Sequence, residues 1–175
     1  MKNYYLLCIS LMLSILCIAQ NDTKNEFEKD FLYHDKYVTE FIDELKDTDV
    51  VNIIRLSDLN FVSNDTYIFW QENNQLFSRL ISNRRLKKRI KNKKMRISKI
   101  DQESIFKLFD TKNDYAFLKE YESCESEFSH HYRINLHIQD NKYDINSSCL
   151  QSIKKNDLVG VLFRIVNGDS GSVPN

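Results

Sequence analysis

The residues best suited to acid–base chemistry in this sequence are His137 and Asp144. In a hairpin that pairs Gln139 with Lys142, their side chains lie opposite each other on the polar face of two neighbouring strands. A carboxylate beside an imidazole can orient the ring for proton transfer. A hydrolase or a metal-dependent enzyme that uses His137 and Asp144 is therefore one hypothesis. The alternative is a solvent-facing cross-strand pair with no catalytic role.

A run of basic residues offers a second kind of chemistry, the binding of anions. Residues 84–96 include nine Lys or Arg and no Asp or Glu, although the whole chain has 25 basic and 25 acidic residues. Such a block can bind the phosphate or sulfate groups of a polyanion, but it offers no aromatic side chain on which bases could stack. The alternative is a solvated loop or edge strand that the protein's own acids partly neutralise. The nine candidates are Arg84, Arg85, Lys87, Lys88, Arg89, Lys91, Lys93, Lys94 and Arg96.

The first 19 residues have the composition of an export signal. Lys2 precedes an apolar run over residues 4–19, and polar residues follow that run directly. A basic start, an apolar stretch and a final small residue predict a cleavable signal peptide, with cleavage after Ala19. The protein is then expected in the periplasm or outside the cell, with no transmembrane segment after cleavage. The alternatives are a retained membrane anchor and a lipoprotein acylated at Cys17, which the bulky residue before that cysteine disfavours.

Cleavage of the leader would leave two of the four cysteines, Cys124 and Cys149. Two cysteines in an exported chain predict one disulfide bond. In the chain-entropy model, a bridge that closes a loop of about 25 residues contributes roughly 3–4 kcal/mol. A nucleophilic role for Cys124 would require a free thiol, which such a bridge excludes.

Glycine is almost absent, and this excludes several classes of enzyme. The three glycines are Gly160, Gly168 and Gly171. The chain before residue 160 therefore contains no glycine-rich phosphate loop, no dinucleotide fingerprint and no glycine-flanked serine elbow. No pair of cysteines has zinc-site spacing. We expect no cofactor, and the favoured function is that of an exported, non-catalytic domain that binds a partner protein or an envelope component.

The periodicity of apolar residues predicts the elements that position these side chains. Apolar residues recur every three or four positions from Phe27 to Leu45, which indicates a helix. Strict alternation over residues 132–138, followed by a turn and residues 143–149, predicts a hairpin, and the Asn73-Asn74 turn predicts another, with Trp70 opposite Phe77. The remaining elements are a strand at 50–54 and helices that start near residues 101 and 157.

These elements together predict an α+β fold. We expect an antiparallel sheet built from two β-hairpins, with the helices packed on one face. The expected organisation is a signal peptide at 1–19, a flexible N-terminal segment at 20–30, one domain at 31–167 and a disordered tail at 168–175.

Two stretches carry a resemblance to other proteins. The segment TYIFWQENNQLF, followed later by YRINLHIQDNKYDINSSC and a closing helix, is similar in style to uncharacterised small exported proteins of Bacteroidetes-type bacteria. The resemblance implies an exported location and an α+β fold. It implies no activity and no functional residues.

Overall fold

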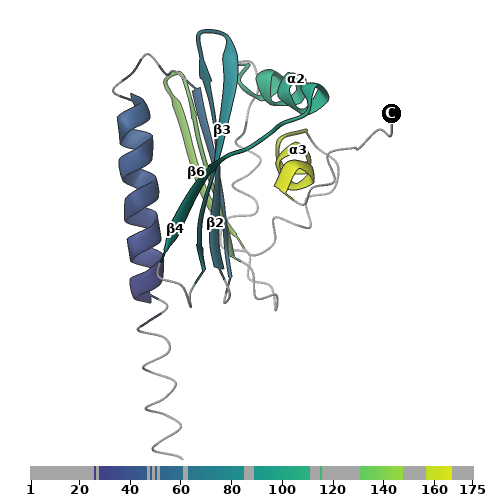
Figure 1. Cartoon of the computed structure of the whole chain (residues 1–175). Helices are drawn as coiled ribbons and strands as arrows, with labels where there is room; N and C mark the ends of the chain where they lie inside the picture. Colours follow the sequence, from purple (N-terminus) through teal and green to yellow (C-terminus); the bar gives the residue numbers. More distant parts are fainter. Residues whose placement is uncertain are drawn as a thin grey trace, which may run out of the picture.

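The computed structural model has an α+β fold with a single six-stranded antiparallel sheet (Figure 1). It describes residues 28–46, 52–60, 63–84, 89–110, 131–147 and 157–166, together with residues 26, 48, 50 and 115. The strands are β1 (Asn52–Leu59), β2 (Ser63–Glu72), β3 (Gln75–Arg84), β4 (Ile90–Lys94), β5 (His131–Ile138) and β6 (Asn141–Ser147), in the order β4-β3-β2-β1-β5-β6. The helices are an N-terminal helix at 28–46, α2 (Lys99–Leu108) and α3 (Asp157–Val166).

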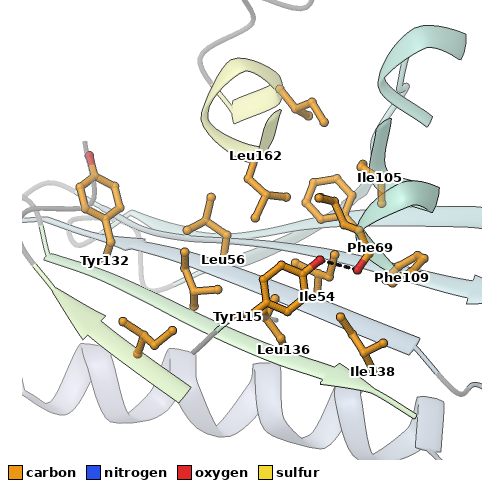
Figure 2. Packing of buried hydrophobic residues seen from close by; sticks show 14 residues of the cluster. Ile54, Leu56, Phe69, Ile105, Phe109, Tyr115, Tyr132, Leu136, Ile138 and Leu162 are labelled. Carbon is orange, nitrogen blue, oxygen red and sulfur yellow. Dashed lines mark hydrogen bonds between the residues drawn. The ribbon is translucent and has the colours of Figure 1, made fainter. Parts of the chain in front are cut away.

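Helices cover both faces of the sheet, and this corrects the expectation of a single covered face. Ile54 of β1 belongs to a core beneath α2 and α3 (Figure 2), whereas its neighbour Ile53 belongs to a second core beneath the N-terminal helix. Successive side chains of a strand point to opposite faces. A central strand that is apolar on both faces must therefore be covered on both, and Figure 1 shows the N-terminal helix on the side of the sheet opposite α2 and α3.

The hairpin β2–β3 has the predicted turn and register. Asn73 and Asn74 both have positive φ angles, of 50° and 59°, which suits the tight turns that connect twisted strands. Trp70 pairs with Phe77, and their rings stack with centroids 5.6 Å apart. Trp70 is buried against the N-terminal helix, so it is a core residue. The sheet also contains β1 and β4, so it is larger than two hairpins alone.

The register of β5 and β6 differs from the predicted one by two residues. Ile138 pairs with Asn141, so Leu136 lies opposite Tyr143 and Tyr132 lies opposite Ser147. Gln139 adopts a φ of 51° in the turn, and its N–H donates to the Asn52 side chain at 3.2 Å. A shift of two residues leaves every side chain on its original face. The apolar pattern therefore cannot distinguish the two registers, and the turn determines which one forms.

Helix α2 is joined to α3 through a buried carboxylate. Ser98 caps α2 by accepting a hydrogen bond from the Asp101 N–H at 3.1 Å, so the helix begins two residues before the predicted start. Asp101 is only 2% exposed, and Arg164 of α3 donates to it at 2.8 Å. In the described part of the chain, no helix has both the length and the apolar character needed to cross a membrane.

Candidate functional site

Residues 90–94 of the basic run form the edge strand β4, which among the described strands pairs with β3 alone. Figure 1 shows it as the outermost strand of the sheet. The four residues from Lys91 to Lys94 are all exposed, as are Arg84, Arg89 and Arg96. An edge strand rich in lysine is also a common protection against edge-to-edge aggregation. This protective role is the simplest alternative to a binding function.

Strand pairing gathers three of the predicted cations around one hollow. Lys91 lies opposite Ser82 of β3, and Arg84 lies two residues further along β3 on the same face. Arg89 directly precedes β4. Together the four residues line a hollow of about 170 Å³. Arg84 and Arg89 come from opposite ends of the connection between β3 and β4, so the sequence alone does not place their side chains together. We call Arg84, Arg89, Lys91 and Ser82 the basic hollow.

The cations of the basic hollow have no acidic partner among the described residues. The described acids that form ion pairs do so elsewhere, as in Asp101 with Arg164 and Asp144 with Arg133. Neutralisation by the protein's own acids, the alternative that the sequence left open, is therefore not seen in the described part of the chain. Lys93 extends the same face along β4, whereas Lys94 lies on the other face. The predicted residues Arg85, Lys87 and Lys88 lie outside the described residues.

The chemistry available at the basic hollow is binding rather than proton transfer. A guanidinium group offers a planar fork of donors that matches two oxygens of a phosphate or sulfate group. Lysine adds a flexible point charge, and the Ser82 hydroxyl adds a neutral donor. Among the described residues, no histidine or carboxylate lines the hollow. Recognition there would consequently depend on charge and on the tetrahedral shape of an oxyanion.

The predicted pairing of His137 with Asp144 is wrong. His137 lies opposite Lys142, and Asp144 lies opposite Asn135, because of the register that the turn imposes. Arg133 donates to the Asp144 carboxylate at 3.3 Å and 3.5 Å. Among the described residues, no group of three or more His, Cys, Asp or Glu is arranged to hold a metal ion.

His137 and Asp144 nevertheless line a common groove of about 330 Å³ between the N-terminal helix and strands β1, β5 and β6. Partial burial and the nearby cations Lys142 and Lys46 lower the pKa of His137. The imidazole is therefore neutral at pH 7 and has no carboxylate directly across the strand to orient it.

A buried polar network under the N-terminal helix was not predicted. His34 is fully buried, and its Nε2 lies 2.9 Å from the Thr66 hydroxyl, which lies 2.9 Å from the Ser57 hydroxyl. Arg55 donates to Ser57 and is paired with Asp35 of the helix. A hydroxyl beside an imidazole resembles an activated nucleophile, but full burial keeps any substrate away. The network instead fixes the helix on the sheet.

Burial and the charge of Arg55 lower the pKa of His34 to about 4. The ring is thus neutral in the folded protein at physiological pH. One weak signal of the network is visible in the sequence: Arg55 and Ser57 lie two residues apart in β1, on the same face as the apolar residues Ile53 and Leu59.

Comparisons of the chain with protein families, with curated proteins and with solved structures found no match. Cys17, Cys124, Cys149 and the signal sequence lie outside the described residues, so the disulfide bond and export stay predictions.

Proposed function

We propose that this protein is a non-catalytic binding domain that holds an anionic polymer at the basic hollow. The observation that carries the proposal is the gathering of Arg84, Arg89 and Lys91 around one hollow of an edge strand, without an acidic partner among the described residues. Unpaired surface cations attract polyanions. Binding is favourable because these cations displace the counterions that are condensed on the polyanion.

A polymer suits the site better than a single small anion. Residues two apart on a strand share a face and lie roughly 6.6 Å apart. Lys93, which shares a face with Lys91, therefore continues the row of positive charge beyond the hollow, and Arg96 follows further along the chain. A chain with repeated phosphate or sulfate groups can contact several of these cations at once, whereas one oxyanion can occupy only the hollow.

The expected exported location narrows the ligand to polymers outside the cytosol. We propose that the ligand is an anionic component of the cell envelope, such as a phosphate-bearing or sulfate-bearing polysaccharide. The leader at 1–19 supports this assignment, because its composition predicts export and cleavage after Ala19. The lack of aromatic residues in the run disfavours a single-stranded nucleic acid, which is commonly bound by base stacking.

Retention on immobilised heparin, a sulfated polysaccharide, tests the proposal. The test variant replaces Arg84, Arg89 and Lys91 by Gln, and should elute at a clearly lower salt concentration than the wild-type protein. The control variant replaces Lys29, Lys36 and Lys99 by Gln. These three lysines are also exposed but lie outside the basic hollow.

Both variants lose three positive charges, so they differ only in where the charge is lost. The control should elute close to the wild-type protein. Equal elution of the two variants would show that net charge, and not the basic hollow, governs retention, and the proposal would be rejected.

A further inference from the structure

The groove beneath the N-terminal helix is a second concave site, remote from the basic hollow. It has a volume of about 330 Å³, within the range of small-molecule sites. The strands β5 and β6 that contribute to it lie at the end of the sheet opposite β4. Figure 1 shows the N-terminal helix alongside the sheet, and the helix residues Thr39, Ile42, Asp43 and Lys46 line the groove.

Both walls of the groove contribute apolar side chains. Ile53 of β1 is buried, and Ile42 of the N-terminal helix is half-buried. Thr39 lies one helical turn before Ile42 on the same wall and is exposed. This arrangement provides a surface for a short hydrocarbon chain, whose burial is favourable in proportion to the apolar area removed from water.

The charges that line the groove leave one cation without an acidic partner among the described residues. Most of the charged side chains at or near the groove form ion pairs: Lys46 with Asp43, Arg55 with Asp35, and Arg133 with Asp144. Lys142 of β6 lines the groove, is exposed and forms no ion pair with a described acid. The groove therefore has charge complementarity for a single negative charge.

The surroundings of His137 support a positive potential at this end of the groove. Its pKa is lowered by burial first and then by Lys142 and Lys46, whose effects exceed the opposing effect of Asp140. His137 lies directly across the strand pair from Lys142. The ring of His137 already forms a hydrogen bond with the backbone of Gln139, and a neutral imidazole has only one N–H to donate, so Lys142 supplies the charge that holds a carboxylate here.

We propose that the groove binds a small amphipathic monoanion, a carboxylate with a short hydrocarbon chain. The hydrocarbon lies against Ile42 and Ile53, and the carboxylate lies beside Lys142 and His137. This site is independent of the polyanion proposed for β4, because it uses other strands and other cations. Sodium octanoate is a suitable probe, and 1-octanol is the matched probe without charge.

Methyl NMR of the purified chain locates and quantifies the binding. Octanoate should shift the methyl signals of Ile42 and Ile53 in a saturable manner and leave that of Ile100, an exposed residue of α2, unmoved. Lys142→Gln should weaken octanoate binding by roughly five- to ten-fold, which corresponds to a loss of about 1–1.4 kcal/mol, and leave octanol binding unchanged. Lys36→Gln, which removes an exposed lysine outside the groove, is the control and should bind octanoate as the wild-type protein does.

Thr39→Trp supplies an independent test, because the residue is exposed and its replacement fills the groove without disturbing the core. This variant should weaken the binding of both probes. The proposal is overturned if octanoate produces no saturable shift of Ile42 and Ile53, or shifts Ile100 equally. It is also overturned if Lys142→Gln binds octanoate as tightly as Lys36→Gln, or if a folded Thr39→Trp variant retains wild-type affinity.

Discussion

Acidification should destabilise this protein through His34, at a pH where most carboxylates are still ionised. The ordinary pKa of histidine, 6.5, applies to the unfolded chain, whereas burial and Arg55 lower the pKa in the folded protein to about 4. Between these pH values the unfolded state binds a proton that the folded state does not, so the unfolding free energy rises with pH. The full stability is present above pH 6.5 and is lost as the pH falls towards 4.

The two pKa values determine the size of the effect. Each pH unit between them corresponds to about 1.36 kcal/mol, so the total loss is roughly 3 kcal/mol, of which about 2 kcal/mol is lost by pH 5. Full burial of the ring and its 2.9 Å contact with the Thr66 hydroxyl justify this conversion, because solvent does not screen the site.

Urea denaturation of the wild-type protein and of His34→Gln, from pH 7.5 to pH 5, measures the loss. The amide of Gln retains hydrogen-bonding capacity towards Thr66 but does not titrate. The wild-type protein should lose about 2 kcal/mol more than the variant over this range. Parallel pH profiles for the two proteins would refute the reasoning, as would an NMR titration that gives His34 a pKa near 6.5.

Three further predictions concern stability and covalent structure. Asp101→Ala removes the buried acceptor of Arg164 and should cost about 1–3 kcal/mol in urea denaturation; a cost below about 0.5 kcal/mol, typical of a surface site, would contradict the assigned role. Asn74→Val places a β-branched residue at a φ of 59° and should lower the unfolding free energy by about 1–2 kcal/mol, whereas Asn74→Gly should preserve it. Equal unfolding free energies for the two variants would exclude the left-handed turn. Mass spectrometry of the exported protein without reduction should find a peptide that joins Cys124 to Cys149, and alkylation of both thiols would disprove the disulfide bond.

Local sequence patterns were sufficient to predict most elements of the fold. Alternation of apolar and polar residues identified β5, and the Asn73-Asn74 turn identified both the β2–β3 hairpin and the Trp70–Phe77 pair. The helix over residues 28–46 follows from apolar residues spaced three or four apart, although it includes residues 28–30, where the sequence predicts a flexible segment. These features depend on residues that are close together in the sequence, so the local pattern is enough to predict them.

Features that depend on long-range contacts were predicted poorly. The register of β5 with β6 is set by a turn whose residue Gln139 also donates to Asn52, a residue 87 positions away in the chain. The covering of both faces depends on which helix packs against Ile53 and which packs against Ile54. The adjacent apolar residues Ile53 and Ile54 indicate that both faces are covered, but they do not indicate which helix covers which face.

The candidate site shows the same division between local and long-range information. The basic run was evident from composition, but the gathering of Arg84 and Arg89 beside Lys91 needs the register of β3 with β4. The groove beneath the N-terminal helix could not be predicted, because its walls come from parts of the chain almost 100 residues apart.

The binding of a long-chain polyphosphate as a function of salt tests the central claim most directly. The logarithm of the association constant should fall linearly with the logarithm of the salt concentration, by roughly 0.7 for each phosphate contacted. Substitution of Arg84, Arg89 and Lys91 by Gln should reduce that slope by about two, and the Lys29, Lys36 and Lys99 control should leave it unchanged. A slope that is the same in all three proteins would contradict the assignment of the basic hollow as the binding site.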